Sequence, residues 1–60
     1  MSMITELFGE EALQKSVDEI KSLIRGLPPT QKERKSYLLH DWAAATGTEL
    51  TADDFLEVEE

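Results

Sequence analysis

The segment Gly26–Thr30 (GLPPT) restricts the possible folds of this chain more than any other part of its sequence. Its two adjacent prolines cannot continue a helix, because each lacks a backbone N–H and restricts the residue before it. Glycine is favoured in the left-handed position just past a helix end, and Thr30 with Glu33 matches the T-x-x-E capping box. The segment therefore predicts a tight turn between two helices, with a left-handed Gly26 closing the first and Thr30 capping the second.

The residues before this turn have the spacing of one helix face. Five apolar positions recur at intervals of four, three, four and three residues, with polar and charged residues between them. These intervals place the apolar side chains along one stripe of an α-helix. The stripe consists of Leu13, Val17, Ile20, Ile24 and Leu27. Acidic residues near the start and basic residues near the end suit the helix dipole, so we predict a helix over residues 10–25.

A second helix is predicted over residues 31–45, and its apolar arc is wider than that of the first. At about 100° per residue, Leu38 and Trp42 share one side of this helix and Leu39 lies farther round. Because the arc is wide, the helix needs two packing neighbours rather than one. Gly47 follows at the position of a helix C-cap.

A short third helix is predicted over residues 52–58. Thr51 and Asp54 match a capping box, and Leu50 can pack on Phe55 as a hydrophobic staple. We expect this helix to fold back over the second one.

Residues 1–9 do not continue the stripe of the helix that follows them. In an unbroken helix, Ile4, Leu7 and Phe8 would lie about 120–180° round from that stripe. Either Gly9 kinks the chain, or these side chains point elsewhere. Two interpretations remain open: residues 1–9 form a mobile or folded-back arm, or they form an apolar patch for a partner.

The small size of the chain limits its stability. It has 60 residues and no cysteine, so there is room for one small domain and neither a disulfide nor a thiolate metal site can stabilise it. Area estimates for so small a core leave almost no net stability, which makes association the remaining source. We therefore predict an all-α fold, a helical hairpin plus a short third helix, which dimerises into a four-helix bundle.

Charge is unevenly distributed along the chain, whose net charge is −7. All six basic residues lie within residues 15–35, whereas residues 36–60 contain seven acidic residues and no basic one. Lys32, Arg34 and Lys35 fall in the first turns of the predicted second helix, where the helix dipole disfavours cations. Either these cations serve solubility, or the basic turn meets an acidic surface such as the acidic end of a second copy.

The sequence contains no catalytic constellation. His40 is the one histidine, and it points away from Leu38 and Trp42 with no carboxylate placed to orient it. The acidic residues near the C-terminus lack the spacing and central glycine of a Ca²⁺ loop, and no glycine-rich phosphate loop is present. We therefore expect no enzyme activity, no cofactor and no metal site.

These features predict a small acidic protein-interaction module, acting as an adaptor, inhibitor or regulator. Small acidic helical proteins are common among phage- and plasmid-borne accessory proteins, which offers an analogy at the level of fold only. The acidic composition argues against binding to DNA and makes RNA a less favoured partner. The alternative function is a nucleic-acid-associated regulator that acts through the basic interhelical turn.

We expect a cytoplasmic location, because the sequence has no apolar run that spans a bilayer and no secretory signal. A homodimer and a further protein partner are the expected associations. The candidate partner-binding residues are Ile4, Leu7, Phe8, Arg25, Lys32, Arg34, Lys35 and Tyr37.

Overall fold

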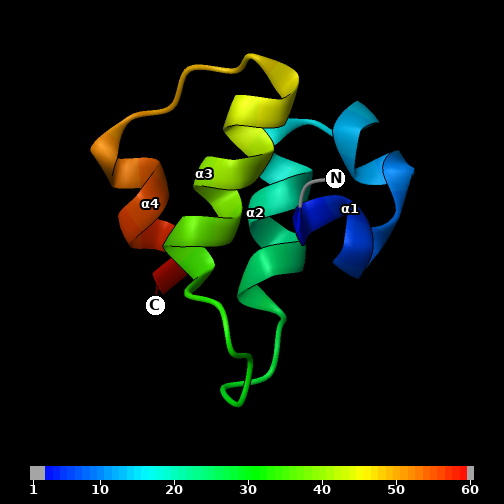
Figure 1. Ribbon diagram of the computed structural model, residues 1–60. Helices are drawn as coiled ribbons and strands as arrows, with labels where there is room; N and C mark the ends of the chain where they lie inside the picture. Colours follow the sequence, from blue (N-terminus) through cyan, green and yellow to red (C-terminus); the bar gives the residue numbers. More distant parts are fainter. Residues whose placement is uncertain (1–2, 60) are drawn as a thin grey trace.

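In the computed structural model, which describes residues 3–59, the chain is all-helical, as the sequence predicts. Four α-helices and one 3-10 helix follow one another, and no strand occurs within the described range (Figure 1). They are α1 (Met3–Phe8), the 3-10 helix η1 (Glu10–Gln14), α2 (Val17–Arg25), α3 (Lys35–Thr46) and α4 (Ala52–Glu59).

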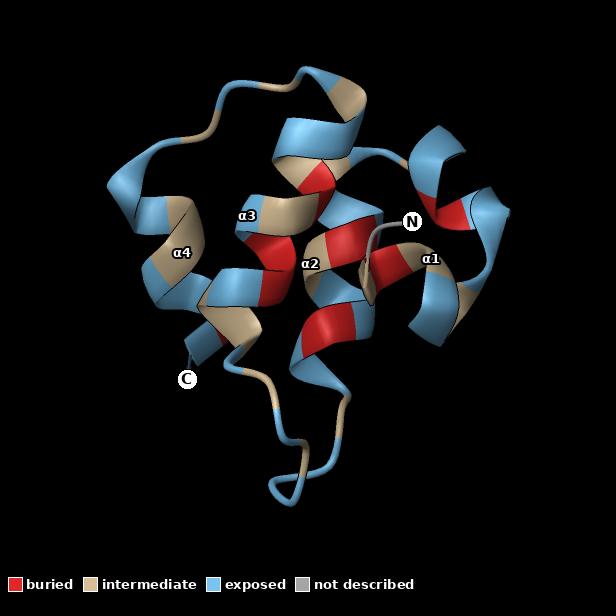
Figure 2. Cartoon of the chain, viewed as in Figure 1, coloured by how far each residue is buried: buried red, intermediate tan, exposed pale blue. Residues whose placement is uncertain are grey.

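Helix α3 lies at the centre of the fold. It contacts α1, η1, α2 and α4, and its residues Leu38, Leu39 and Trp42 are buried. Figure 2 shows the buried residues of α1, α2 and α3 facing one another. The wide apolar arc of α3 is therefore covered from several sides by its own chain. This corrects the reasoning that led to a four-helix bundle, because a second chain is not needed to cover α3.

The predicted helix over residues 10–25 is broken at Lys15 and Ser16. Ser16 caps α2: its Oγ accepts a hydrogen bond from the Glu19 backbone N–H at 3.3 Å, and Glu19 accepts one from the Ser16 N–H at 3.4 Å. This is a complete capping box, so α2 begins at Val17. The break also turns Leu13 outward to 38% exposure and places Ala12 in the core in its stead.

The N-terminal residues from Met3 onward form a docked helix. Gly9 has a φ of +81° and separates α1 from η1, which is the kink that the sequence allowed. Ile4 is fully buried, and its N–H donates to Asp41 Oδ2 at 3.2 Å, so a carboxylate of α3 caps α1. Residues 3–9 are therefore folded back onto the core, which is one of the arrangements that the sequence left open; residues 1–2 lie outside the described range.

Helix α3 begins at Lys35, four residues later than predicted. The Gln31 N–H donates to the Pro28 carbonyl at 3.0 Å, so the segment after the prolines is a turn rather than a first helical turn. Gly26 lies at φ −76°, in the right-handed region, and the predicted left-handed cap at this glycine is wrong. Gly47 does adopt the left-handed conformation, at φ +70°, and ends α3 as predicted.

The two glycines should therefore respond differently to alanine. We expect Gly47→Ala to lower the free energy of unfolding by about 1 kcal/mol, because a Cβ is strained at positive φ. Gly26→Ala should be neutral or slightly stabilising, since its Cβ would sit at 3.5 Å from the Leu23 carbonyl, an ordinary contact. Thermal denaturation of the two variants checks this, and equal losses would contradict the backbone assignment.

The C-terminal helix α4 covers one side of the core. It begins at residue 52, as predicted, and ends at 59 rather than 58. Asp54 Oδ2 accepts a hydrogen bond from the Thr51 N–H at 3.0 Å, which is one half of the predicted capping box. Val58 is fully buried, and both Leu50 and Phe55 pack against the core. These contacts fold α4 back over α3 and α2.

Candidate functional site

The acidic helix α4 is held to α2 by an ion-pair cluster. Lys21 Nζ lies 2.9 Å from Asp54 Oδ1 and 2.7 Å from Glu57 Oε2. The hydrogen bonds to Glu57 and then to Asp54 raise the pKa of Lys21. In turn, the hydrogen bond from Lys21, followed by that from the Thr51 backbone, lowers the pKa of Asp54. Lys21 and Asp54 therefore form an ion pair at neutral pH.

A third acidic residue of α4, Glu59, meets the start of α3. Glu59 Oε1 accepts a hydrogen bond from the Ser36 backbone N–H at 3.3 Å. Hydrogen bonds from Ser36, and then the charges of Arg34 and Lys35, lower the pKa of Glu59. Because the local N-cap residue Arg34 makes no side-chain cap hydrogen bond, Glu59 supplies the negative charge that this helix end favours.

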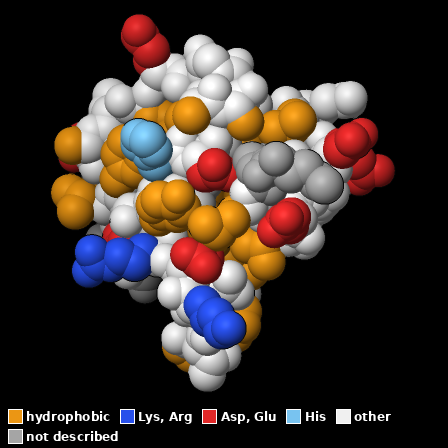
Figure 3. Space-filling view, in the orientation of Figure 1, with side chains coloured by type: hydrophobic (Ala, Val, Ile, Leu, Met, Phe, Trp, Pro, Cys, Tyr) orange, Lys and Arg blue, Asp and Glu red, His pale blue; other side chains and the backbone are white. Residues whose placement is uncertain are grey.

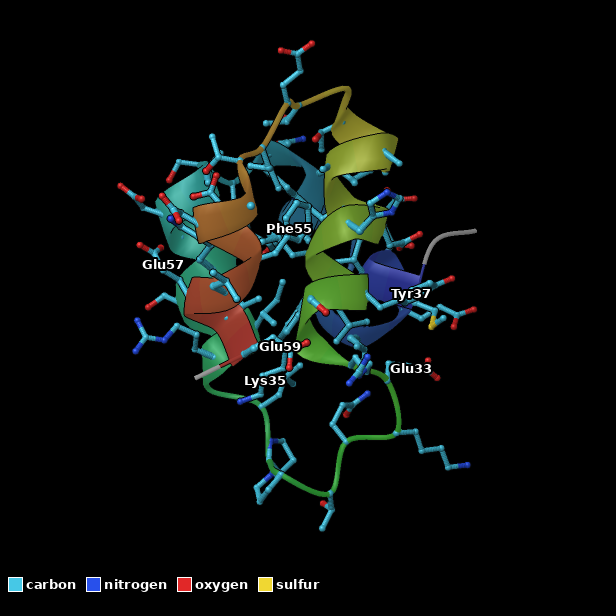
Figure 4. All side chains as sticks on the ribbon, turned by 90° about the vertical axis from the view of Figure 1, so that its left-hand side faces the viewer. Glu33, Lys35, Tyr37, Phe55, Glu57 and Glu59 are labelled. Carbon is cyan, nitrogen blue, oxygen red and sulfur yellow. The ribbon has the colours of Figure 1, made fainter. Side chains whose placement is uncertain are left out.

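The head group of Lys35 turns away from the start of α3. Its Nζ donates to the Arg25 carbonyl at 2.9 Å, at the end of α2, where a cation suits the helix dipole. Figure 4 shows Lys35 and Glu59 close together between the ends of α3 and α4. Arg34 and Lys35 thus lie near the carboxylate of Glu59 from α4 of the same chain, whereas Lys32 lies in the loop before α3.

These contacts make the attachment of α4 sensitive to acid. Both Asp54 and Glu59 have pKa values below their ordinary 3.8 and 4.5, so the stability that they contribute is present above those values. This stability should be lost as the pH falls from the ordinary pKa values through the lowered pKa values of the two carboxyl groups. Melting temperatures measured from about pH 6 to about pH 3 should therefore drop steeply below about pH 4.5.

Lys21→Met is the variant that tests this pH dependence. It removes the hydrogen bond that most lowers the pKa of Asp54, so the acid-induced drop in melting temperature should become shallower. Lys32→Met is the matched control, because Lys32 is exposed in the loop before α3. An unchanged acid response in Lys21→Met would contradict the role of this cluster.

An apolar surface lies along α3 and α4, and we name it the α3–α4 face. Two shallow hollows of about 400 and 350 Å³ adjoin there and share His40 and Phe55 as lining residues. Figure 3 shows hydrophobic side chains gathered over these two helices. The face consists of Arg34, Ser36, Tyr37, His40, Ala43, Ala44, Gly47, Thr48, Leu50 and Phe55.

Aromatic side chains form the middle of the α3–α4 face. Tyr37 is 51% exposed, and the rings of His40 and Phe55 lie 6.3 Å apart in a tilted arrangement. Tyr37 and Phe55 project from two different helices, as labelled in Figure 4. Tyrosine and arginine dominate the binding energy of many protein interfaces, and here Arg34 flanks the aromatic groups. The arrangement is suited to contact and offers no acid–base pair.

A smaller groove lies between α1 and the loop that precedes α3. It has a volume of about 320 Å³, and Leu7 and Lys32 lie on its opposite walls together with Met3 and Pro28. Leu7 is 41% exposed. The groove brings together two predicted contact residues that are far apart in the sequence. Its other lining residues are Glu6, Thr30, Gln31 and Glu33.

The structure divides the predicted partner-binding residues into separate groups. Ile4 is buried in the core and is not available on the surface, and Phe8 packs partly against that core. Leu7 and Lys32 line the small groove, whereas Arg34 and Tyr37 line the α3–α4 face. Arg25 and Lys35 are joined by a hydrogen bond at the meeting point of α2 and α3.

Only Arg34 and Tyr37 of the α3–α4 face were among the predicted contact residues, and its two central rings, His40 and Phe55, were not. His40 was predicted to be exposed, and Phe55 was predicted to pack on Leu50 as a staple. Each expectation is consistent with the structure, yet neither placed the two rings side by side. That juxtaposition depends on how α4 docks on α3, and no local sequence pattern reports it.

Within residues 3–59, no group of three histidine, cysteine or acidic side chains is arranged to hold a metal ion. None of the described helices has the length and apolar character of a membrane span. No protein-family model matches the chain, and no curated protein or solved structure is significantly similar to it.

Proposed function

We propose that this chain is a non-enzymatic protein-interaction module and that its contact surface is the α3–α4 face. The observation that carries the proposal is the pair of adjoining apolar hollows that meet at His40 and Phe55. A half-exposed Tyr37 and the flanking Arg34 supply the residue types that anchor protein interfaces. An adaptor, inhibitor or regulator requires such a surface and requires no catalytic group.

The charge arrangement favours a protein partner over a nucleic acid. A nucleic-acid site needs basic side chains that are free to neutralise phosphates. Here the carboxylate of Glu59 lies beside Arg34 and Lys35 and already lowers the positive potential there. For the alternative function, RNA binding through the basic turn, a gel shift at low salt that disappears in an Arg34→Glu variant would be required. We expect no shift.

Site-directed photo-crosslinking tests the proposal. A photo-reactive amino acid replaces Tyr37 on the α3–α4 face. In a separate control variant it replaces Leu23 on α2, because Leu23 is an apolar residue that is also partly exposed, at 37%. In an extract of the source cells, we expect a discrete protein adduct from position 37 and none from position 23. Equal adducts from both positions, or none from position 37, would refute the proposed contact surface.

A further inference from the structure

We propose that the partner of the α3–α4 face is the same face of a second copy, bound antiparallel about a two-fold axis near His40. This inference rests on the proposed function and names the occupant of its surface. It uses a different surface from the four-helix bundle expected from the sequence, because the core-facing side of α3 is covered within one chain.

The face has opposite charges at its two ends. Arg34 lines the hollow at the start of α3. At the other end, Thr48 and Leu50 line the second hollow, and the exposed Glu49 lies between them in the chain. Figure 3 shows Lys and Arg side chains at the lower end of this view and an acidic side chain at its upper end. An antiparallel pair therefore places Arg34 of each copy against Glu49 of the other.

The aromatic centre of the face lies near the middle of α3. His40 follows Arg34 by six residues and precedes Gly47 by seven, which at 1.5 Å per residue is about 9 Å and about 10 Å along α3. A two-fold axis through this point stacks the group of Tyr37, His40 and Phe55 on its own symmetry mate. The surface is thus complementary to itself in both charge and polarity, as an isologous interface requires.

The available surface is adequate for a dimer of modest affinity. A standard interface buries about 800 Å² on each partner. The accessible surface of the described chain is 4182 Å², so a standard interface would cover about a fifth of it. One side of so small a molecule meets that requirement. Opposite charges at the rim favour the antiparallel arrangement, and reversal of one of them places like charges against each other.

Sedimentation equilibrium of the full chain and its variants tests this inference. The wild type is measured from about 10 μM to about 1 mM, a range that covers weak dimers. Arg34→Glu and Glu49→Arg should each lower the association constant about tenfold, because symmetry creates two repulsive contacts in each dimer. The double variant R34E/E49R should restore it. Tyr37→Ala should also lower it about tenfold through lost aromatic contact.

Two controls separate this effect from a loss of folding. Lys32→Glu makes the same change of charge as Arg34→Glu but lies outside the face, so its association constant should equal that of the wild type. Arg34→Glu also places a like charge near Glu59 within one chain. Because Glu49→Arg cannot repair that intramolecular repulsion, recovery in the double variant reports the contact between copies.

The outcomes distinguish failure of this inference from failure of the proposed function. A wild type that stays monomeric up to about 1 mM, or a double variant that stays weak, overturns the antiparallel homodimer. In the first case, a crosslinked adduct from position 37 with a mass other than that of two copies would still support the α3–α4 face as a contact surface. Absence of both the dimer and the adduct would refute both proposals.

Discussion

Replacing Trp42 with alanine is expected to leave most of the chain unfolded at 25 °C. Trp42 is 2% exposed and lies in α3, the helix that contacts both η1 and α1. Truncation of a buried tryptophan costs about 3–5 kcal/mol, which equals or exceeds the stability that a core of this size supplies. Far-UV circular dichroism and urea denaturation should show a loss of helix without added denaturant.

Trp42→Phe separates the packing of this side chain from its hydrogen bond. The indole Nε1 donates to the Ala12 carbonyl at 2.7 Å and ties η1 to α3. Phenylalanine keeps most of the apolar contact but leaves the Ala12 carbonyl with only its 3.4 Å hydrogen bond from the Lys15 N–H. We therefore expect a folded variant that has lost about 1 kcal/mol. A Trp42→Ala variant with wild-type unfolding free energy would show that η1 does not pack on α3 as described.

The second large effect is expected at Ile4. Its side chain is fully buried and belongs to the main core cluster, so Ile4→Ala should lower the free energy of unfolding by about 2–5 kcal/mol. The same truncation at Leu7, on the same helix but 41% exposed, should change it by no more than about 0.5 kcal/mol. Urea denaturation of the two variants measures the difference.

This pair tests whether α1 is an integral part of the fold. If residues 3–9 were a mobile arm, both truncations would have small and similar effects. A large loss at both positions would instead indicate that α1 packs with a different face toward the core. The contrast between the two variants therefore checks the helix and its orientation together.

The sequence predicted those features that depend on neighbouring residues. Val17, Ile20 and Ile24 have helical spacing, and the structure places them on the inner side of α2. Gly47 was predicted as a left-handed cap because a glycine follows an apolar helix, and the structure confirms it. The break before α2 was also encoded locally: Ser16 and Glu19 form a capping box that was read as part of one longer helix.

Other features depend on residues that are distant in the sequence, and local patterns could not predict them. Thr30 and Glu33 match a capping box, yet α3 starts at Lys35, where Glu59 accepts the hydrogen bond from the Ser36 N–H. The helical α1 likewise depends on Asp41 of α3. For the candidate site, Arg34 and Tyr37 were predicted, whereas the contribution of α4 required knowledge of its docking.

The Glu59–Ser36 contact also has a consequence for how the protein is made. The two residues are 23 positions apart, and α3 precedes Glu59 in the order of synthesis. Because Glu59 is added to the chain after α3, the full stabilisation of the start of α3 requires that residue 59 is present. For the same reason, a protease that cleaves the chain after Val58 would destabilise α3, although the cleavage site lies outside that helix.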